Sequence, residues 1–304
     1  MKKILFLIIF INIDFFIYIH FKSYIIQKFN INFDYINYEK SIITKKMKNL
    51  AGWMFQTSNQ YYFINGIIRK HKPKICLEVG VASGGSSILI LNAIKDIENS
   101  RLISIDLNTN LYFNNEYKTG YRVKEYFPEL LNKWNLFTGE QPHIFLQKLR
   151  MNFDFVFLDT AHMSPGEILN IIEILPFLNE NSIVIIHDII WHFMEENPNA
   201  FKRFSSPSLH LISSLYGDKI VIKNDKGIEN IGAAFLYKNQ KQHYLDYFLL
   251  LLSHWEYIPT EKQLKEIRIF IKKYYKNDLY LLIFDISIKN NKKYLANKKF
   301  GEVA

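Results

Sequence analysis

A glycine-containing loop, EVGVASGGSS, has the residue types needed to hold a small charged ligand. Gly80 allows a sharp turn after an apolar run, and Gly84 lets a ligand approach the backbone without a Cβ clash. The amides of a following helix and the hydroxyl of Ser86 would face a negative group such as a carboxylate. Glu78 would accept a hydrogen bond from an ammonium group. The loop therefore predicts a ligand that carries both charges.

A second acidic residue extends this site toward a nucleoside. Asp106 ends the apolar run RLISID, where a carboxylate can accept from both hydroxyls of a ribose. The dinucleotide fingerprint requires a glycine at position 82, which is Ala82 here, and Glu78 would be unfavourable beside a pyrophosphate. Both points favour S-adenosylmethionine over NAD, and an NAD-type oxidoreductase is the alternative.

The elements that must position these residues alternate between strands and helices. Five apolar runs predict strands, and a later pair of runs predicts an antiparallel hairpin. The runs cover 74–79, 101–107, 134–139, 153–159 and 182–188, with the hairpin at 218–222 and 231–237 and helices at 88–97 and 166–178. This order predicts an α/β fold with a doubly wound, Rossmann-like, seven-stranded sheet whose site lies at the carboxyl ends of the strands.

The segments EVGVASGGSS, ISID, FDFVFLDTAH and SIVIIHDIIW together resemble class I S-adenosylmethionine-dependent methyltransferases. Within that class they are similar to the O-methyltransferase branch and its "methyltransferase 24" domains, over about residues 54–238. The resemblance implies that Glu78, Gly80, Gly84 and Ser86 hold the methionine part and that Asp106 holds the ribose. Glu140 falls where that branch lines the adenine pocket.

The same resemblance implies a metal site and a base. Metal-dependent members carry an Asp after the fourth strand and an Asp-Asn pair after the fifth, which correspond here to Asp159, His187 and Asp188. Carboxylates suit Mg²⁺, whereas an imidazole at position 187 also tolerates Mn²⁺, Fe²⁺ or Zn²⁺. His162 stands where the branch often has a lysine base, and histidine suits that role near neutral pH. Asp159 and His162 are therefore the predicted catalytic pair.

Each of these residues also has a purely structural interpretation. Gly80 and Gly84 could serve a tight turn, Glu78 could end a strand at the surface, and Asp106 or Asp159 could cap a helix. Structural interpretations are also open for five further residues. Glu140 could be loop surface, His187 a satisfied histidine, and Trp191 packing rather than acceptor pocket, while His143 and His192 could be surface histidines.

Composition excludes several protein classes. The chain has 304 residues, of which 49% are hydrophobic and 22% are charged, so it can bury a full core. Its single cysteine, Cys76, excludes an internal disulfide and a multi-cysteine zinc site. The net charge is +9, but only six of the 38 basic residues are arginine, so we expect no nucleic-acid partner.

The two ends of the chain lie outside this methyltransferase-like segment. Residues 1–47 form a hydrophobic and basic extension in which residues 4–21 could span a membrane. Asp14 makes a span costly, by roughly 2.5–3.5 kcal/mol, so an element docked on the protein or loosely on a membrane surface is the preferred interpretation. A cytosolic cofactor predicts a cytoplasmic protein in either case.

Residues 48–238 are the predicted methyltransferase domain, with Trp53, Gln56 and Tyr61 as candidate lid residues. Residues 239–304 are the predicted helical extension, which could bind substrate, form a homodimer or pack on the N-terminal element. The expected reaction is O-methylation of a small molecule or a sugar, with a divalent metal (Mg²⁺ or Mn²⁺) as an open possibility. A non-catalytic, membrane-associated assembly module is the second alternative.

Overall fold

The computed structural model describes residues 30–31, 58–191, 207–224 and 227–301. The apolar segment 4–21, the lid candidates Trp53 and Gln56, and His192 lie outside the described residues. Within the described ranges, no helix has both the length and the apolar character needed to cross a bilayer.

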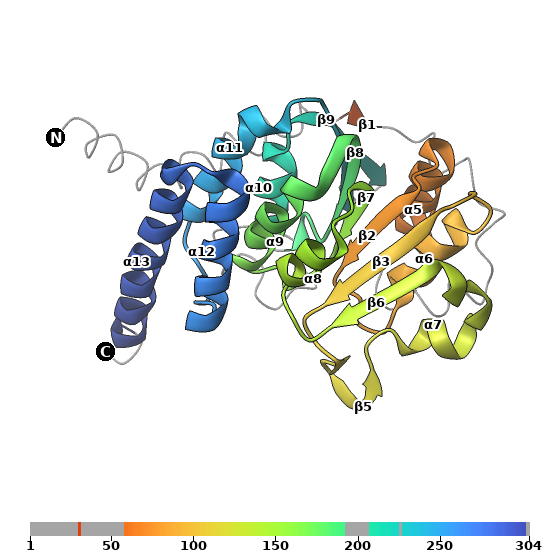
Figure 1. The fold of residues 1–304 in the computed structure, drawn as a ribbon, viewed down its shortest axis with the longest axis horizontal. Coiled ribbons are helices and arrows are strands. Elements are labelled where there is room, and N and C mark those ends of the chain that lie inside the picture. Colours follow the sequence, from red (N-terminus) through yellow and green to blue (C-terminus); the bar gives the residue numbers. More distant parts are fainter. Residues whose placement is uncertain (1–29, 32–57, 192–206, 225–226, 302–304) are drawn as a thin grey trace.

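The central element is an eight-stranded sheet (Figure 1). Its strands lie in the order β1-β9-β10-β8-β7-β2-β3-β6. Their bounds, in that order, are Asn30–Ile31, Gly217–Asn224, Gly227–Leu236, Leu178–His187, Phe153–Leu158, Ile75–Val79, Arg101–Asp106 and Trp134–Thr138.

The pairing confirms the predicted doubly wound fold. Strands β6, β3, β2, β7 and β8 pair in parallel, and β10 pairs antiparallel with both β8 and β9. The predicted antiparallel hairpin is therefore β9–β10. The sheet differs from the prediction by one short strand, because Asn30 of β1 pairs in parallel with Ile220 of β9.

Helices cover both faces of the sheet, and each face has its own buried cluster. The cluster on one face contains residues of α5, α6 and α7, and the cluster on the other contains residues of α8 to α13, of which α12 and α13 lie farthest from the sheet in Figure 1. Alternating strand residues divide between them, since Leu77 and Val156 belong to one cluster while Cys76 and Phe155 belong to the other. The helices are α5 (Ser58–His71), α6 (Gly85–Ile94), α7 (Tyr121–Tyr126), α8 (Pro142–Leu149), α9 (Gly166–Ile174), α10 (Pro207–Ser214), α11 (Tyr244–Leu249), α12 (Glu261–Tyr275) and α13 (Asp278–Gly301).

The predicted helix after the glycine loop is α6, and all ten of its residues are buried. Its sequence, GSSILILNAI, has no charged residue, which fits a helix enclosed between α5, α7 and the sheet. The glycine loop therefore leads directly into a buried helix. The packing of α6 against its neighbours fixes the position of the loop's C-terminal end.

The C-terminal helices belong to the same buried cluster as the sheet. Trp255, Phe270 and Phe284 are buried in the cluster that contains Leu77. Within the predicted helical extension, α12 begins with a capping box between Thr260 and Gln263. The proposed domain boundary at residue 238 stays a prediction, but residues 239–301 pack as part of one body.

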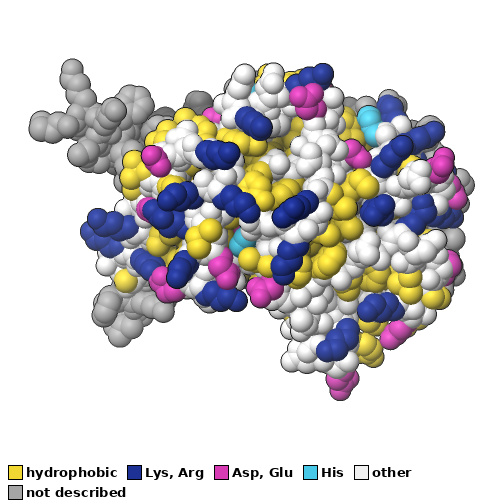
Figure 2. Space-filling view, viewed as in Figure 1, with side chains coloured by type: hydrophobic (Ala, Val, Ile, Leu, Met, Phe, Trp, Pro, Cys, Tyr) yellow, Lys and Arg dark blue, Asp and Glu magenta, His cyan; other side chains and the backbone are white. Residues whose placement is uncertain are grey.

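A small hairpin that the sequence analysis did not predict follows β3. Strands β4 (Asn110–Leu111) and β5 (Asn114–Lys118) form it, and it projects from the main body in Figure 1. Tyr112 and Phe113 at its turn are exposed, with their rings packed edge to face. On the face drawn in Figure 2, Lys and Arg side chains are scattered among apolar ones rather than gathered into one stripe.

Candidate active site

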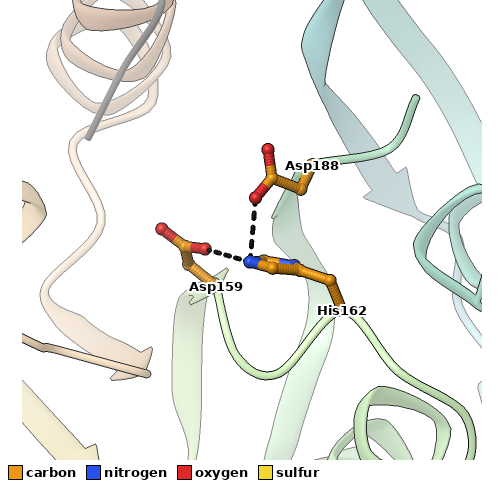
Figure 3. A group of neighbouring side chains, drawn as sticks. All are labelled: Asp159, His162 and Asp188. Atoms are coloured by element: carbon orange, nitrogen blue, oxygen red, sulfur yellow. Dashed lines mark ion pairs between the residues drawn. The ribbon is translucent and has the colours of Figure 1, made fainter. Parts of the chain in front are cut away.

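Four predicted site residues lie together at the carboxyl ends of two adjacent parallel strands, and Figure 3 shows Asp159, His162 and Asp188 among them. Asp159 follows β7, His187 is the last residue of β8, and Asp188 comes next. His162 reaches them from the loop between β7 and α9, and its Nε2 lies 2.8 Å from Asp188 Oδ2 and 3.4 Å from Asp159 Oδ1. All four side chains are at least four-fifths buried.

The backbone at this cluster has an uncommon conformation. His162 has φ of 51° and Asp188 has φ of 54°, both in the left-handed region. Asn230 of β10 holds Asp188 there, because its carbonyl accepts from the Asp188 amide at 2.8 Å and its side chain donates to the Asp188 carboxylate. Non-glycine residues are kept in such conformations chiefly at functional sites.

The charges of the cluster are strongly coupled. Burial acts to lower the pKa of His162, but its hydrogen bonds to Asp188 and Glu167 hold that pKa well above the ordinary value. Burial likewise opposes ionisation of His187, and the carboxylates of Asp188 and Asp159 raise its pKa to about 10. Burial acts to raise the pKa of Asp188, but the two histidines hold it well below its usual range. The carboxylates of Asp159 and Asp188 therefore favour a positive charge at this point, whether on an imidazole or on a bound cation.

The donor atoms also fit a divalent cation. Asp159, His162 and Asp188 each offer one ligand atom, and these atoms lie within 4.8 Å of one another. Two carboxylates and an imidazole are suitable for Mn²⁺, Fe²⁺ or Zn²⁺ as well as Mg²⁺. His187, the third member of the predicted ligand set, lies beside them, with Nδ1 at 3.5 Å from Asp159 Oδ1 and 3.4 Å from Asp188 Oδ1. Its Nε2 faces Gln60 Oε1 at 3.3 Å.

The glycines of the loop are needed for close packing of the chain itself. Gly80 has φ of 89°, and a Cβ there would lie 1.7 Å from the carbonyl oxygen of Asp159. Gly84 has φ of 97°, and a Cβ there would lie 2.9 Å from Val123. Both residues therefore meet the structural requirement of a tight turn. Gly80 in addition brings the glycine loop directly against the end of β7, beside Asp159.

Glu78 is fully buried, so its alternative interpretation as a surface strand end is wrong. Three serine hydroxyls donate to its carboxylate, from Ser86 at 2.5 Å, Ser87 at 2.6 Å and Ser104 at 2.5 Å. Burial raises the pKa of this carboxyl to about 7, although the serine hydroxyls act to lower it. The Ser86 hydroxyl, which we expected to face the ligand, thus points to Glu78 in this structure. The cofactor roles of Glu78 and Ser86 stay predictions.

Asp106 ties the end of β3 to the glycine loop. Its Oδ2 accepts from the amides of Val81 at 2.8 Å and Ala82 at 3.0 Å, and its Oδ1 accepts from the amide of Asn108 at 2.8 Å. A carboxylate oxygen can accept more than one hydrogen bond, so these contacts leave capacity for a hydroxyl. The predicted contact with a ribose stays a prediction.

Among the described residues, three buried polar atoms near this edge of the sheet have no hydrogen-bond partner. They are the hydroxyls of Ser83 in the glycine loop and Thr160 after β7, and the amide oxygen of Gln141 after β6. Buried polar groups are normally paired, so these three fit the polar groups of a bound molecule. The neighbouring Glu140 is half-exposed and lies 3.8 Å from Lys262 of α12. These observations fit a nucleoside-containing cofactor along the ends of β2, β3, β6 and β7.

The structure also places the remaining predicted residues. The lid candidate Tyr61 lies buried within α5, and Trp191 is half-buried just after Asp188. The prediction of a surface position for His143 is wrong, because that residue is 1% exposed and faces Glu173 of α9. A sequence that places a histidine right after a proline at a helix start contains no signal of this burial.

Two residues near the site escaped the sequence analysis. Glu167 of α9 is fully buried and faces His162, which no local sequence pattern indicates. Partial burial, with a smaller effect of the Asp159 carboxylate, raises the pKa of the Tyr112 phenol at the turn of the β4–β5 hairpin. The residue as a whole is 70% exposed.

Comparison with known proteins agrees with this geometry. Residues 77–189 match the family model described as "Methyltransferase domain" (methyltransferase 24), a segment that runs from β2 to just beyond Asp188. This segment is therefore similar to methyltransferase domains. The match contains every predicted site residue of the chain, so the resemblance stated from the sequence is confirmed there. Among curated proteins, no sequence matches the chain.

Solved structures of methyltransferases share parts of the fold at low sequence identity. The O-methyltransferase TomG from Streptomyces achromogenes, solved with S-adenosylmethionine, is 17% identical over 66% of this chain and 91% of its own, with a TM-score of 0.45. An O-methyltransferase from Bacillus cereus is 16% identical over 65% and 91%, with a TM-score of 0.44. The Podospora anserina methyltransferase PaMTH1 is 16% identical over 72% and 94%, with a TM-score of 0.45.

Proposed function

We propose that the methyltransferase domain transfers a methyl group from S-adenosylmethionine to a hydroxyl oxygen of a small-molecule or saccharide acceptor. The observation that carries this proposal is the meeting of Asp159, His162 and Asp188 beside the glycine loop. A site that only bound a ligand would have no need of two buried carboxylates around a buried imidazole. This cluster disfavours the non-catalytic module, and Ala82 in the loop disfavours the NAD-type oxidoreductase.

The roles of the residues follow from their positions. Asp106 and the glycine loop would hold the adenosine and methionine parts, with Glu78 behind the loop. His162 would accept the proton of the acceptor hydroxyl through Nε2, while Asp159 and Asp188 stabilise the imidazolium so formed. The bond from sulfur to the methyl carbon breaks as the oxygen–carbon bond forms, and S-adenosylhomocysteine leaves. Because the sulfonium is already activated, positioning and proton removal account for most of the catalysis.

A divalent cation held by Asp159, Asp188 and a histidine would make the acceptor hydroxyl more acidic. The protein would contribute by holding the two carboxylates at a fixed separation. In this structure His162 Nε2 lies between them, in contact with both Asp159 and Asp188. We expect a vicinal diol or a catechol to be the preferred acceptor if the metal is required, since two adjacent oxygens can bind one cation.

Transfer of a labelled methyl group tests the proposal. Purified protein incubated with labelled S-adenosylmethionine and panels of phenols, sugars and cell-envelope extracts should transfer label to an oxygen. The His162→Asn variant should lose about 10²–10⁴-fold in kcat while S-adenosylhomocysteine binding is retained. His143→Asn is the control, because that histidine is also buried and also faces a glutamate, but on another side of α9. Binding without turnover in every extract and with every metal would instead support the non-catalytic module.

A further inference from the structure

Glu167 contacts the ring nitrogen of His162 that faces away from the two aspartates. Its Oε1 lies 3.0 Å from His162 Nδ1, whereas Nε2 faces Asp188 and Asp159 on the opposite side of the ring. A carboxylate can only accept hydrogen bonds, so Nδ1 must carry a proton to bond to an ionised Glu167. Nε2 is then the ring nitrogen that faces the two aspartates.

The other oxygen of Glu167 is also fixed. The Ser208 hydroxyl of α10 donates to Oε2, and both Glu167 and Ser208 are fully buried. Glu167 is the second residue of α9, where a helix N-terminus favours a negative charge. Its own place at the start of α9 and the hydrogen bond from Ser208 of α10 thus hold the Glu167 carboxylate in one orientation toward the ring.

The loop that carries His162 is held at a further point. The Ser164 amide donates to Glu256 Oε2 at 2.9 Å, and the Glu256 amide donates back to the Ser164 carbonyl at 2.8 Å. Tyr257 closes the start of α9, since a Cβ on Gly166 would lie 2.6 Å from its hydroxyl oxygen. The backbone on both sides of Pro165 is therefore fixed by the segment that precedes α12.

We propose that Glu167, itself oriented by Ser208, is a positioning residue that fixes the ring orientation and the Nδ1–H tautomer of His162. In this arrangement Nε2 always faces the space between Asp159 and Asp188, either to accept the acceptor's proton or to ligate a cation. Without Glu167 the ring could rotate about its χ2 angle or exchange tautomers, and the productive fraction would fall. The catalytic part of this inference rests on the proposed function, but the hydrogen bond itself does not.

Proton NMR of protein labelled with ¹⁵N-histidine tests the hydrogen bond directly. We expect a downfield Nδ1–H resonance, assigned to His162 by its loss in His162→Asn. Glu167→Ala should abolish this resonance and lower kcat about 10–100-fold, with the affinity for S-adenosylhomocysteine unchanged. Glu167→Gln can still offer an amide oxygen to Nδ1–H. It should therefore retain part of the Nδ1–H resonance and part of the wild-type kcat.

The matched control is Glu173→Ala, which removes an equally buried glutamate of the same helix that faces His143 instead. It should leave the His162 resonance and kcat unchanged, and its affinity for S-adenosylhomocysteine checks that it is folded. A His162 resonance that persists in Glu167→Ala, or one that is lost with no change in kcat, would overturn the proposal. If the wild-type protein transfers no methyl group at all, the proposed function fails, and the resonance still decides whether Glu167 holds the ring.

Discussion

Asp188 Oδ2 lies 2.8 Å from His162 Nε2, across the ends of two adjacent strands. This contact joins the residue predicted as a metal ligand to the residue predicted as a base. The predicted ligand set contained His187, whereas the atoms that best surround one point belong to Asp159, His162 and Asp188. A bound cation and a protonated His162 would therefore each place a positive charge beside the carboxylates of Asp159 and Asp188.

Metal removal should separate these two possibilities. We expect EDTA to abolish methyl transfer and Mg²⁺ or Mn²⁺ to restore it, because the two carboxylates require a nearby cation. Asp188→Ala should lose turnover and keep its affinity for S-adenosylhomocysteine, since Asp188 does not contact the glycine loop. Initial rates at fixed substrate provide the measurement. Undiminished activity in EDTA, with loss only in His162→Asn, would show that the histidine acts alone and that no metal is used.

The pH dependence of folding should report on Glu78. Burial raises its pKa from 4.5 to about 7 in the folded protein, so the folded state binds a proton that the unfolded state releases. This contribution to stability is complete below pH 4.5 and is lost as pH rises through 7, which amounts to at most about 3 kcal/mol.

Glu78→Gln should remove this dependence, because its amide does not ionise. Urea unfolding of both proteins between pH 4 and 8 then gives the test, expressed as the difference between their free energies of unfolding. As the pH rises, the free energy of unfolding of the wild type should fall relative to that of Glu78→Gln. A difference that is constant over the whole range would mean that the pKa of Glu78 is the same in the folded and unfolded protein, which would contradict the prediction.

The C-terminal extension should support catalysis through Glu256. Glu256→Ala would leave the buried amide of Ser164 without its acceptor, which costs about 1–3 kcal/mol of stability. The loop that carries His162 would loosen, so kcat should fall more than the affinity for S-adenosylhomocysteine. Thermal unfolding and steady-state kinetics measure the two effects.

Glu261→Ala is a suitable control for this prediction, because Glu261 is 81% exposed and pairs only with Lys292 among the ion pairs of the described chain. Glu256→Gln retains an oxygen for the Ser164 amide and should behave nearly as the wild type. An unchanged kcat in Glu256→Ala would mean that the contact between Glu256 and the His162 loop does not contribute to catalysis.

The sequence allowed the sheet and the position of the site to be predicted for a simple physical reason. Apolar runs that end in Asp106, Asp159 and Asp188 are typical of buried parallel strands, whose carboxyl ends meet at one edge. Those residues do meet there, and the hairpin at the end of the domain pairs as expected.

The partners of these residues could not be predicted, because they come from distant segments. Ser104 and Glu78 are 26 residues apart, Ser208 and Glu167 are 41 apart, and Glu256 lies 92 residues from Ser164. Only packing brings such pairs together, and a polar residue in a helix or loop does not indicate which side chain it will face. The burial of Glu78 and His143 was missed for the same reason.

The affinity for the cofactor tests the central claim most directly, and the chain offers a matched pair of aspartates for it. Asp106 accepts two backbone amides at the carboxyl end of β2, and Asp154 accepts those of Lys74 and Ile75 at its opposite end. Calorimetry should show that the wild type and Asp154→Ala bind S-adenosylhomocysteine alike, whereas Asp106→Ala binds at least about tenfold more weakly through loss of a ribose contact. Binding of NAD⁺ in place of S-adenosylhomocysteine, or equal affinities in both variants, would contradict the account.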